Sequence, residues 1–126
     1  MTSLDVISAI RSSWSDETKF PGTPKDSCPE AGHCAVTALV VQRLLGGKIL
    51  RAARVISDDL DYGSHYWNLL PDGTSLDLTL SQFPLPVWVE GCTEASIEKI
   101  IANGNTAHRF AILLDRVRVA LKIDAP

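Results

Sequence analysis

The chain has 126 residues, of which 45% are hydrophobic and 21% are charged, and its formal net charge is -3 at pH 7. This length predicts a single domain over residues 1–126 that is large enough to bury a core, and the composition is typical of a globular protein. The mild acidity gives no reason to expect nucleic acid or an anionic membrane as a partner.

The first residues and the cysteines bear on the compartment. Residues 1–14 include the acidic Asp5 and contain no continuous apolar stretch, so they do not resemble a signal peptide. The chain has three cysteines, Cys28, Cys34 and Cys92. An odd number fits reduced thiols better than a disulfide framework. We therefore expect a cytoplasmic protein.

The N-terminal third predicts a helix, a loop and a second helix. Apolar residues recur at helical spacing over residues 4–14, with Ser3 as the expected N-cap. Ser15–Gly32 carries three prolines and two glycines, which indicates a loop. Residues 32–45 form an almost uniformly apolar helical run that ends at Gly46-Gly47. A helix that is apolar nearly all round is buried on most of its surface.

The remaining residues predict three strands followed by two helices. The strand candidates are Lys48–Ile56, Ser64–Leu70 and Thr74–Leu80. The helices are expected over residues 94–102, capped by Thr93, and over residues 107–122. Because no helix separates the strands, they should pair antiparallel. The expected fold class is therefore α+β, with the buried N-terminal cysteine helix packed on a small antiparallel sheet.

Cys34 stands at the first turn of the expected buried helix. Unpaired N–H groups and the helix macrodipole favour a negative charge at that position. A thiol there should be more acidic than a free thiol, and the thiolate is its reactive form. The question that follows is whether the chain supplies a base for this thiol.

The segment Ser64–Thr79 predicts a hairpin that brings a histidine and an aspartate together. A three-residue Pro71-Asp72-Gly73 loop would place His65 and Asp77 on one face as diagonal neighbours, roughly 7–8 Å apart at the backbone. A two-residue Asp72-Gly73 turn would shift the register by one residue, place Asn68 opposite Asp77 and turn Asp77 away from His65. The catalytic interpretation therefore depends on the longer loop.

Cys34, His65 and Asp77 have the side chains that nucleophilic catalysis by a thiol requires. A cysteine nucleophile needs a base to take its proton, and that base needs an acceptor to fix its tautomer. If the buried helix packs on the face that carries His65 and Asp77, the three groups meet. The backbone N–H of Cys34 could then donate to a developing oxyanion.

These motifs also resemble a known family. Cysteine on a buried helix, then histidine and aspartate on successive strands, is the chain order of transglutaminase-like and papain-like cysteine hydrolases. More closely, the chain resembles the YunG-like family of small bacterial proteins from about Trp14 to the last helix. The segments that carry this resemblance are Gly32-x-Cys34-Ala35-Val36-Thr37-Ala38-Leu39-Val40-Val41-Gln42, Gly46-Gly47, His65-Tyr66-Trp67-Asn68, Asp77-Leu78-Thr79 and Gln82-Phe83.

The resemblance implies a papain-like fold with Cys34 as nucleophile, His65 as base and Asp77 as the group that orients the base. The chain departs from the pattern around the nucleophile. His33 stands where glutamine is expected before the cysteine. Papain-like peptidases take an oxyanion-hole glutamine from six residues upstream, where this chain has Cys28. The second oxyanion donor is left open, with Gln82 or another backbone N–H as candidates.

Four further residues are candidates for substrate binding or the oxyanion hole: His33, Trp67, Asn68 and Gln82. Each has a purely structural alternative. His33 could be a loop or capping residue, and Trp67 could fill the core or shield the catalytic pair. Asn68 could replace Asp77 as the orienting group. Gln82 could simply bond to backbone.

No cofactor or metal is expected. The cysteines and histidines show neither a CxxC nor an HxxxH pair, and Cys28-x5-Cys34 is not a zinc-knuckle spacing. The last predicted helix is locally basic, through His108, Arg109, Arg116, Arg118 and Lys122. We interpret this as a solvated face, with a pocket for an acidic substrate group as the alternative.

The sequence therefore predicts a thiol-dependent enzyme that cleaves or transfers an acyl group of an amide, peptide or thioester through an acyl-cysteine intermediate. The expected partner is a small-molecule or peptide substrate. The acceptor decides between a hydrolase and a transglutaminase-like acyltransferase. Two alternatives lie outside catalysis: a binding module on the same fold, and a redox-sensing thiol with Cys28 or Cys92 as its partner.

Overall fold

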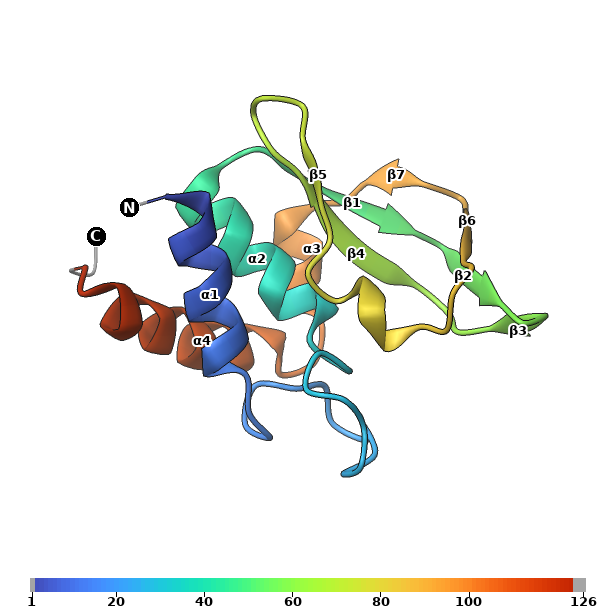
Figure 1. Ribbon diagram of the computed structural model, residues 1–126, viewed down its shortest axis with the longest axis horizontal. Coiled ribbons are helices and arrows are strands. Elements are labelled where there is room, and N and C mark those ends of the chain that lie inside the picture. Colours follow the sequence, from blue (N-terminus) through green and yellow to red (C-terminus); the bar gives the residue numbers. More distant parts are fainter. Residues whose placement is uncertain (1, 124–126) are drawn as a thin grey trace.

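The computed structural model describes residues 2–123, which fold into a layer of helices beside two small sheets (Figure 1). The helices are α1 (Ser3–Ser13), α2 (Cys34–Leu45), α3 (Ile97–Ala102) and α4 (Thr106–Leu121). No helix within the described residues has the length and apolarity needed to cross a membrane.

The strands form two antiparallel sheets. They are β1 (Lys48–Ala52), β2 (Arg54–Ser57), β3 (Leu60–Asp61), β4 (His65–Leu69), β5 (Ser75–Leu76), β6 (Trp88–Glu90) and β7 (Thr93–Glu94), with a 3-10 turn, η1 (Leu80–Gln82), after β5. One sheet has the order β5-β4-β1-β7 and the other β3-β2-β6. Every strand pair in these sheets is antiparallel, so the expected α+β class with antiparallel pairing is confirmed.

The core is organised around α2, as the apolar run predicted. On one side Val36, Val40 and Val41 pack with residues of α1 and α4. On the other side Ala38 and Leu39 pack against the four-stranded sheet and α3. Because both flanks of α2 are covered, six consecutive residues from Val36 to Val41 are buried. The helix thereby fixes the position of Cys34 at its first residue.

The end of α2 shows why two glycines follow it. Gly46 and Gly47 both have positive φ angles, of 79° and 84°. A Cβ on Gly47 would lie 2.2 Å from the carbonyl oxygen of Leu69. Glycine is therefore required where the chain turns from α2 into β1 and passes against the end of β4.

The prediction of a single strand over residues 48–56 is wrong, because the chain passes from one sheet to the other at Ala53. The N–H of Ala53 donates to the carbonyl groups of Glu90 and Gly91, at 2.9 and 3.2 Å. Residues before this point pair with β4 and β7, and those after it pair with β3 and β6. The segment between β2 and β4 contains the short strand β3. Strands β6 and β7 were not predicted, since they are short and exposed and show no alternating apolar pattern.

Three predicted boundaries differ for local reasons. The first helix is capped by Thr2 rather than Ser3, through a capping box with Asp5. The third helix begins at Ile97 with Ser96 as its N-cap, because Thr93 and Glu94 are held in β7. The second hairpin strand ends at Leu76 instead of Leu80, where the chain turns into η1.

Candidate active site

The hairpin between β4 and β5 has the register that the three-residue loop predicts. Asn68 pairs with Leu76 and Leu69 pairs with Ser75. The N–H of Leu70 donates to the carbonyl of Thr74 at 2.8 Å, and Gly73 closes the loop with a φ angle of 88°. The prediction of a three-residue Pro71-Asp72-Gly73 loop is therefore confirmed.

His65 and Asp77 form a direct hydrogen bond across this hairpin. Nε2 of His65 lies 2.7 Å from Oδ2 of Asp77, and the two side chains are 1% and 16% exposed. Oδ1 of Asp77 accepts from the backbone N–H of Thr79 at 3.1 Å, which holds the carboxylate in place. Since a carboxylate only accepts, Nε2 carries the proton, and Nδ1 is the free nitrogen of a neutral ring. Within residues 2–123, this buried Nδ1 has no hydrogen-bond partner.

Two aromatic rings enclose the imidazole. The indole of Trp67 stacks on it with centroids 5.9 Å apart, and Phe83 meets it edge-on at 5.0 Å. These rings belong to a small apolar cluster with Ala52 and Val55. Water is thereby kept from the ring faces, which strengthens the interaction of the imidazole with charged neighbours. The structure places Trp67 in both roles that the sequence suggested, as core residue and as shield.

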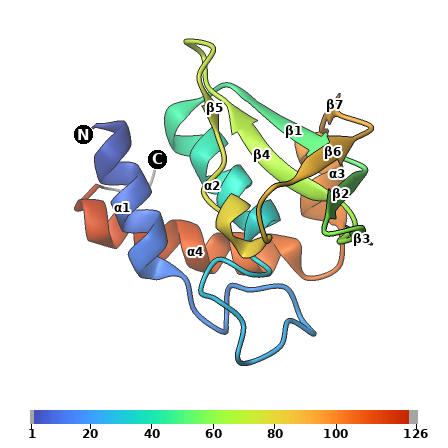
Figure 2. The same ribbon diagram turned by 45° about the vertical axis from the view of Figure 1, so that its right-hand side comes forward.

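Cys34 lies near His65, but α2 does not pack on the side of β4 that carries this histidine. Helix α2 packs on the opposite face of β4, where the side-chain amide of Asn68 donates to the carbonyl of Ala38 at 3.0 Å. The condition that α2 packs on the face of β4 that carries His65 and Trp67 is therefore not met. Cys34 nevertheless lies close enough to His65, at the start of β4, to help raise the pKa of the imidazole. In Figure 2 the N-terminal end of α2 lies beside the yellow η1 turn.

The hydrogen bond of the Asn68 side-chain amide also distinguishes between Asn68 and Asp77 as the group that orients the imidazole of His65. Asn68 is 2% exposed and its side chain is directed at α2, whereas Asp77 contacts the imidazole. Asn68 therefore ties the sheet to the central helix and does not orient His65.

The charges around His65 favour its protonated form. Burial lowers the pKa of His65, but the hydrogen-bonded carboxylate of Asp77 and the neighbouring Cys34 thiolate outweigh burial and raise it to about 9. At neutral pH the imidazole of His65 can therefore be protonated and paired with the carboxylate of Asp77. A protonated imidazole next to a thiol favours the thiolate form of that thiol.

We expect the pairing of His65 to make stability pH-dependent. Its folded-state pKa of about 9 lies above the ordinary 6.5, so its stabilisation is complete below pH 6.5 and is lost as the pH rises through 9. The shift corresponds to roughly 3 kcal/mol of unfolding free energy. Urea denaturation at pH 6 and 9.5 should show this loss in the native chain and a much smaller one in Asp77→Asn. Equal losses in both proteins would contradict the assignment of the pair.

A cavity of about 430 Å³ opens over the thiol. It is bounded by the start of α2, the start of β4, η1 and the start of α4, and its lining residues are Phe20, Thr23, Gly32, Cys34, Ala35, Tyr62, Ser64, Tyr66, Gln82, Asn103, Thr106 and Arg109. Gln82 is one of the four sequence candidates. Its Nε2 is buried and, within the described part of the chain, has no hydrogen-bond partner.

His33 does not share this cavity. Its Nε2 lies 2.7 Å from the hydroxyl of Thr18, and its ring stacks on Trp14 with centroids 5.4 Å apart. It lines a separate pocket of about 90 Å³ together with Cys28. Burial lowers the pKa of His33 to about 4, so the ring is neutral at pH 7. The geometry assigns His33 to the packing of the loop before α2.

Three residues at the site were not assigned from the sequence. Thr79 holds the carboxylate of Asp77, and Phe83 covers the ring of His65. Arg109 lines the cavity, although the basic helix was interpreted as a solvated face. The Asp77-Leu78-Thr79 segment carried a readable signal, because an aspartate commonly accepts from the backbone two residues on. No local pattern marks Phe83 or Arg109.

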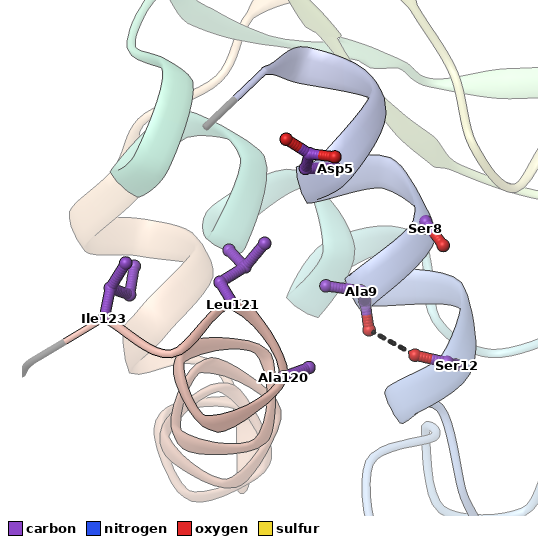
Figure 3. A pocket seen from close by; sticks show the side chains of 7 residues that line it. All are labelled: Asp5, Ser8, Ala9, Ser12, Ala120, Leu121 and Ile123. Atoms are coloured by element: carbon purple, nitrogen blue, oxygen red, sulfur yellow. Dashed lines mark hydrogen bonds between the residues drawn. The ribbon is translucent and has the colours of Figure 1, made fainter.

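Other parts of the described chain offer less chemistry. No cluster of three or more histidine, cysteine or acidic side chains among residues 2–123 could hold a metal. Cys28 and Cys92 are exposed and free, whereas Cys34 is half-buried. A pocket of about 600 Å³ lies between α1 and the end of α4 (Figure 3). Its described lining includes Ser8 and Ser12 but neither a cysteine nor a histidine.

Comparison with known proteins gives the family. The model of the YunG protein family matches residues 2–122. The chain belongs to the YunG family. It is also 33% identical, over 78 residues, to the uncharacterized protein YunG of Bacillus subtilis (strain 168). That similarity covers 62% of this chain and 60% of the Bacillus YunG protein. No solved structure matches the chain.

Proposed function

We propose that this YunG-family protein is a thiol-dependent enzyme that cleaves or transfers an acyl group through an acyl-Cys34 intermediate. The observation that carries the proposal is the position of His65, which is hydrogen-bonded to Asp77 through Nε2 and lies near Cys34, a residue that lines the cavity. A structural histidine has no need of an ion-pair partner on one side and a thiol on the other. The alignment of three such groups is what nucleophilic catalysis requires.

The first half-reaction follows from this geometry. Nδ1 of His65 takes the proton of the Cys34 thiol, and the sulfur attacks the carbonyl carbon of an amide, peptide or thioester. The developing oxyanion accepts from the backbone N–H of Cys34 and from Nε2 of Gln82, two donors at the same cavity. The imidazolium then gives its proton to the leaving amine or thiol, and the acyl group remains on Cys34.

The helix start supports the first of these donors. Cys34 is the first residue of α2, and its N-cap residue His33 makes no side-chain capping bond. N–H groups in the first helical turn have no partner within the helix. The Cys34 N–H is therefore free to stabilise negative charge, and the helix dipole acts in the same direction.

The second half-reaction regenerates the thiol. His65 removes a proton from water or from an amine, which attacks the acyl carbon and displaces the Cys34 sulfur. Water as acceptor makes the protein a hydrolase, and an amine makes it a transglutaminase-like acyltransferase. We place the activity on small-molecule or peptide substrates in the cytoplasm, since free cysteines suit a reducing compartment.

The same argument extends to the superfamily. The chain order of cysteine on a buried helix, histidine on a strand and aspartate after the next strand supports a papain-like or transglutaminase-like relationship. The second oxyanion donor would then come from a different position in the chain than it does in papain-like peptidases. Cys28, at the position where papain-like peptidases carry the glutamine, is exposed and lines another pocket. Gln82, from η1, would take that role.

Trapping of the acyl-enzyme tests the proposal. The native protein is mixed with activated esters and thioesters, such as p-nitrophenyl acetate, and its intact mass is recorded within the first turnover. We expect an acyl adduct that peptide mapping assigns to Cys34 and that is absent in Cys34→Ala. An adduct only on the exposed Cys28 or Cys92, or equal labelling of the Cys34→Ala chain, would overturn the assignment.

A further inference from the structure

Arg109 is a buried cation that forms no ion pair with a carboxylate of residues 2–123. Its side chain is 3% exposed, although it lies in the first turns of α4 close to the surface loops. Its Nε donates to the Asn105 side chain at 2.9 Å, Nη1 to the carbonyl of Thr18 at 3.3 Å and Nη2 to the hydroxyl of Thr106 at 3.2 Å. All three partners are neutral. None of the ion pairs within residues 2–123 includes Arg109.

Burying a guanidinium in this way is costly, and buried charges in proteins are normally paired. The neutral bonds fix the orientation of the group without neutralising it. They also leave part of its hydrogen-bonding capacity unused, since a guanidinium carries more N–H groups than these bonds occupy. The ring of Phe20 lies 5.5 Å from Cζ and supports the group on one side.

The unpaired charge lies at the proposed reaction centre. Arg109 and Cys34 line the same cavity of about 430 Å³. Burial lowers the pKa of Arg109, and the nearby Cys34 thiolate acts in the opposite direction. The walls of the cavity otherwise carry aromatic and neutral polar side chains, among them Tyr62, Tyr66 and Asn103. Arg109 therefore gives the cavity a fixed positive charge within range of the sulfur.

The other basic residues of α4 lie elsewhere. His108 is exposed, and Arg116 is occupied by Ser15 and by the carboxylate of Glu17. None of the four other basic residues, His108, Arg116, Arg118 and Lys122, lines the cavity. The alternative that the sequence left open, a pocket for an acidic group, therefore depends on Arg109 alone among these residues.

We propose that Arg109 binds an anionic group of the substrate, a carboxylate or a phosphate, and so selects acidic acyl compounds for attack by Cys34. The planar guanidinium matches the geometry of both anions and can bind either through two parallel hydrogen bonds. The position of the reacting carbonyl rests on the proposed acyl-Cys34 chemistry. The anion site itself rests on the burial and the neutral partners of Arg109.

The test compares two alkylating reagents that differ in charge. A chain with Cys28→Ser and Cys92→Ser retains Cys34 as its single thiol, and a chain with Cys28→Ser and Cys34→Ser provides the exposed Cys92 as reference. For each protein, the rate with iodoacetate is divided by the rate with neutral iodoacetamide at low ionic strength. This ratio cancels changes in thiol ionisation, because both reagents attack the same thiolate.

We expect a ratio about tenfold higher at Cys34 than at Cys92, since a desolvated cation nearby attracts the carboxylate of iodoacetate. Arg109→Met, which replaces the buried charge by an apolar chain of similar length, should lower the ratio severalfold, and the part that remains above the reference value is due to the imidazolium of His65. Arg116→Met should leave it unchanged. An unchanged ratio in folded Arg109→Met would overturn the anion site.

A second measurement needs no variant at position 109. Sodium acetate and inorganic phosphate are tested as protectants of Cys34 against iodoacetamide, with sodium chloride at matched ionic strength as control. Protection by acetate indicates a carboxylate site, and protection by phosphate a phosphate site. Absence of protection by both anions contradicts the proposal. The outcome is separate from that of the proposed function, which is tested by the acyl adduct on Cys34 and by the effect of His65→Ala on the iodoacetamide rate.

Discussion

Replacing His65 by alanine should slow the reaction of Cys34 with iodoacetamide at pH 6.5 by tenfold to about a hundredfold. An ordinary thiol, with a pKa near 8.5, is only about 1% thiolate at that pH. In the native chain the imidazolium of His65, whose pKa Asp77 and Cys34 raise to about 9 against the effect of burial, supplies the positive charge that holds a thiolate. Without the ring, alkylation should depend on pH as it does for a free thiol.

The measurement is the pH profile of iodoacetamide alkylation between pH 4 and 10, with Cys28 and Cys92 replaced by serine. His108→Ala is the matched control, because His108 is an exposed histidine on α4 that does not line the cavity. It should leave the profile unchanged. Asp77→Asn should give an intermediate profile, since the ring stays in place but loses its charged partner. Identical profiles for His65→Ala and the parent chain would favour a binding module on this fold.

The parts of the site that the sequence could predict rest on local chemistry. The Pro71-Asp72-Gly73 loop fixes the register of the hairpin, because proline and glycine each demand one conformation of a three-residue turn. The register in turn brings His65 and Asp77 together. The position of Cys34 at a buried helix start follows in the same way from an apolar run that ends at two glycines.

The parts that were missed depend on contacts between distant segments. The face of β4 on which α2 packs is decided by Asn68 and Ala38, whose side-chain and backbone partners no local pattern reveals. The burial of Arg109 depends on the carbonyl of Thr18, which lies 91 positions away in the sequence. The split of the first strand depends on Ala53 meeting Glu90 and Gly91. Periodicity describes one element at a time, so it predicted the elements better than their docking.

The sequence named Gln82 only as one of several candidate oxyanion donors, because the position of this residue also depends on how the chain packs. Gln82 lies in the η1 turn, and its amide reaches the cavity because Asp77 and Thr79 end the hairpin strand early and turn the chain. Had the strand continued to Leu80, as predicted, η1 could not have formed there. The group that orients His65 and the turn that places Gln82 are therefore parts of one local structure.

Replacement of Gln82 should slow the acylation of the Cys34 sulfur but not its alkylation. Attack on a carbonyl produces an oxyanion, whereas alkylation by iodoacetamide does not. Removal of one oxyanion-hole donor typically lowers an acyl-transfer rate by about 10²–10³. We therefore expect Gln82→Ala to slow acylation of Cys34 by p-nitrophenyl acetate to that extent while the iodoacetamide rate stays within about twofold, because the cysteine–histidine pair is intact.

Two further variants show whether slower acylation reflects the loss of an oxyanion donor or a change in the structure of η1. Gln82→Glu keeps the size of the side chain but replaces the donor N–H groups by a carboxylate, so it should slow acylation at least as much as alanine does. Asn103→Ala alters another polar residue of the same cavity and should leave both rates unchanged. A parallel fall of acylation and alkylation in the Gln82 variants would assign this residue to the structure of η1. An unchanged acylation rate would show that the second donor is a backbone N–H, since the buried and unpartnered amide of Gln82 would then contribute nothing to the transition state.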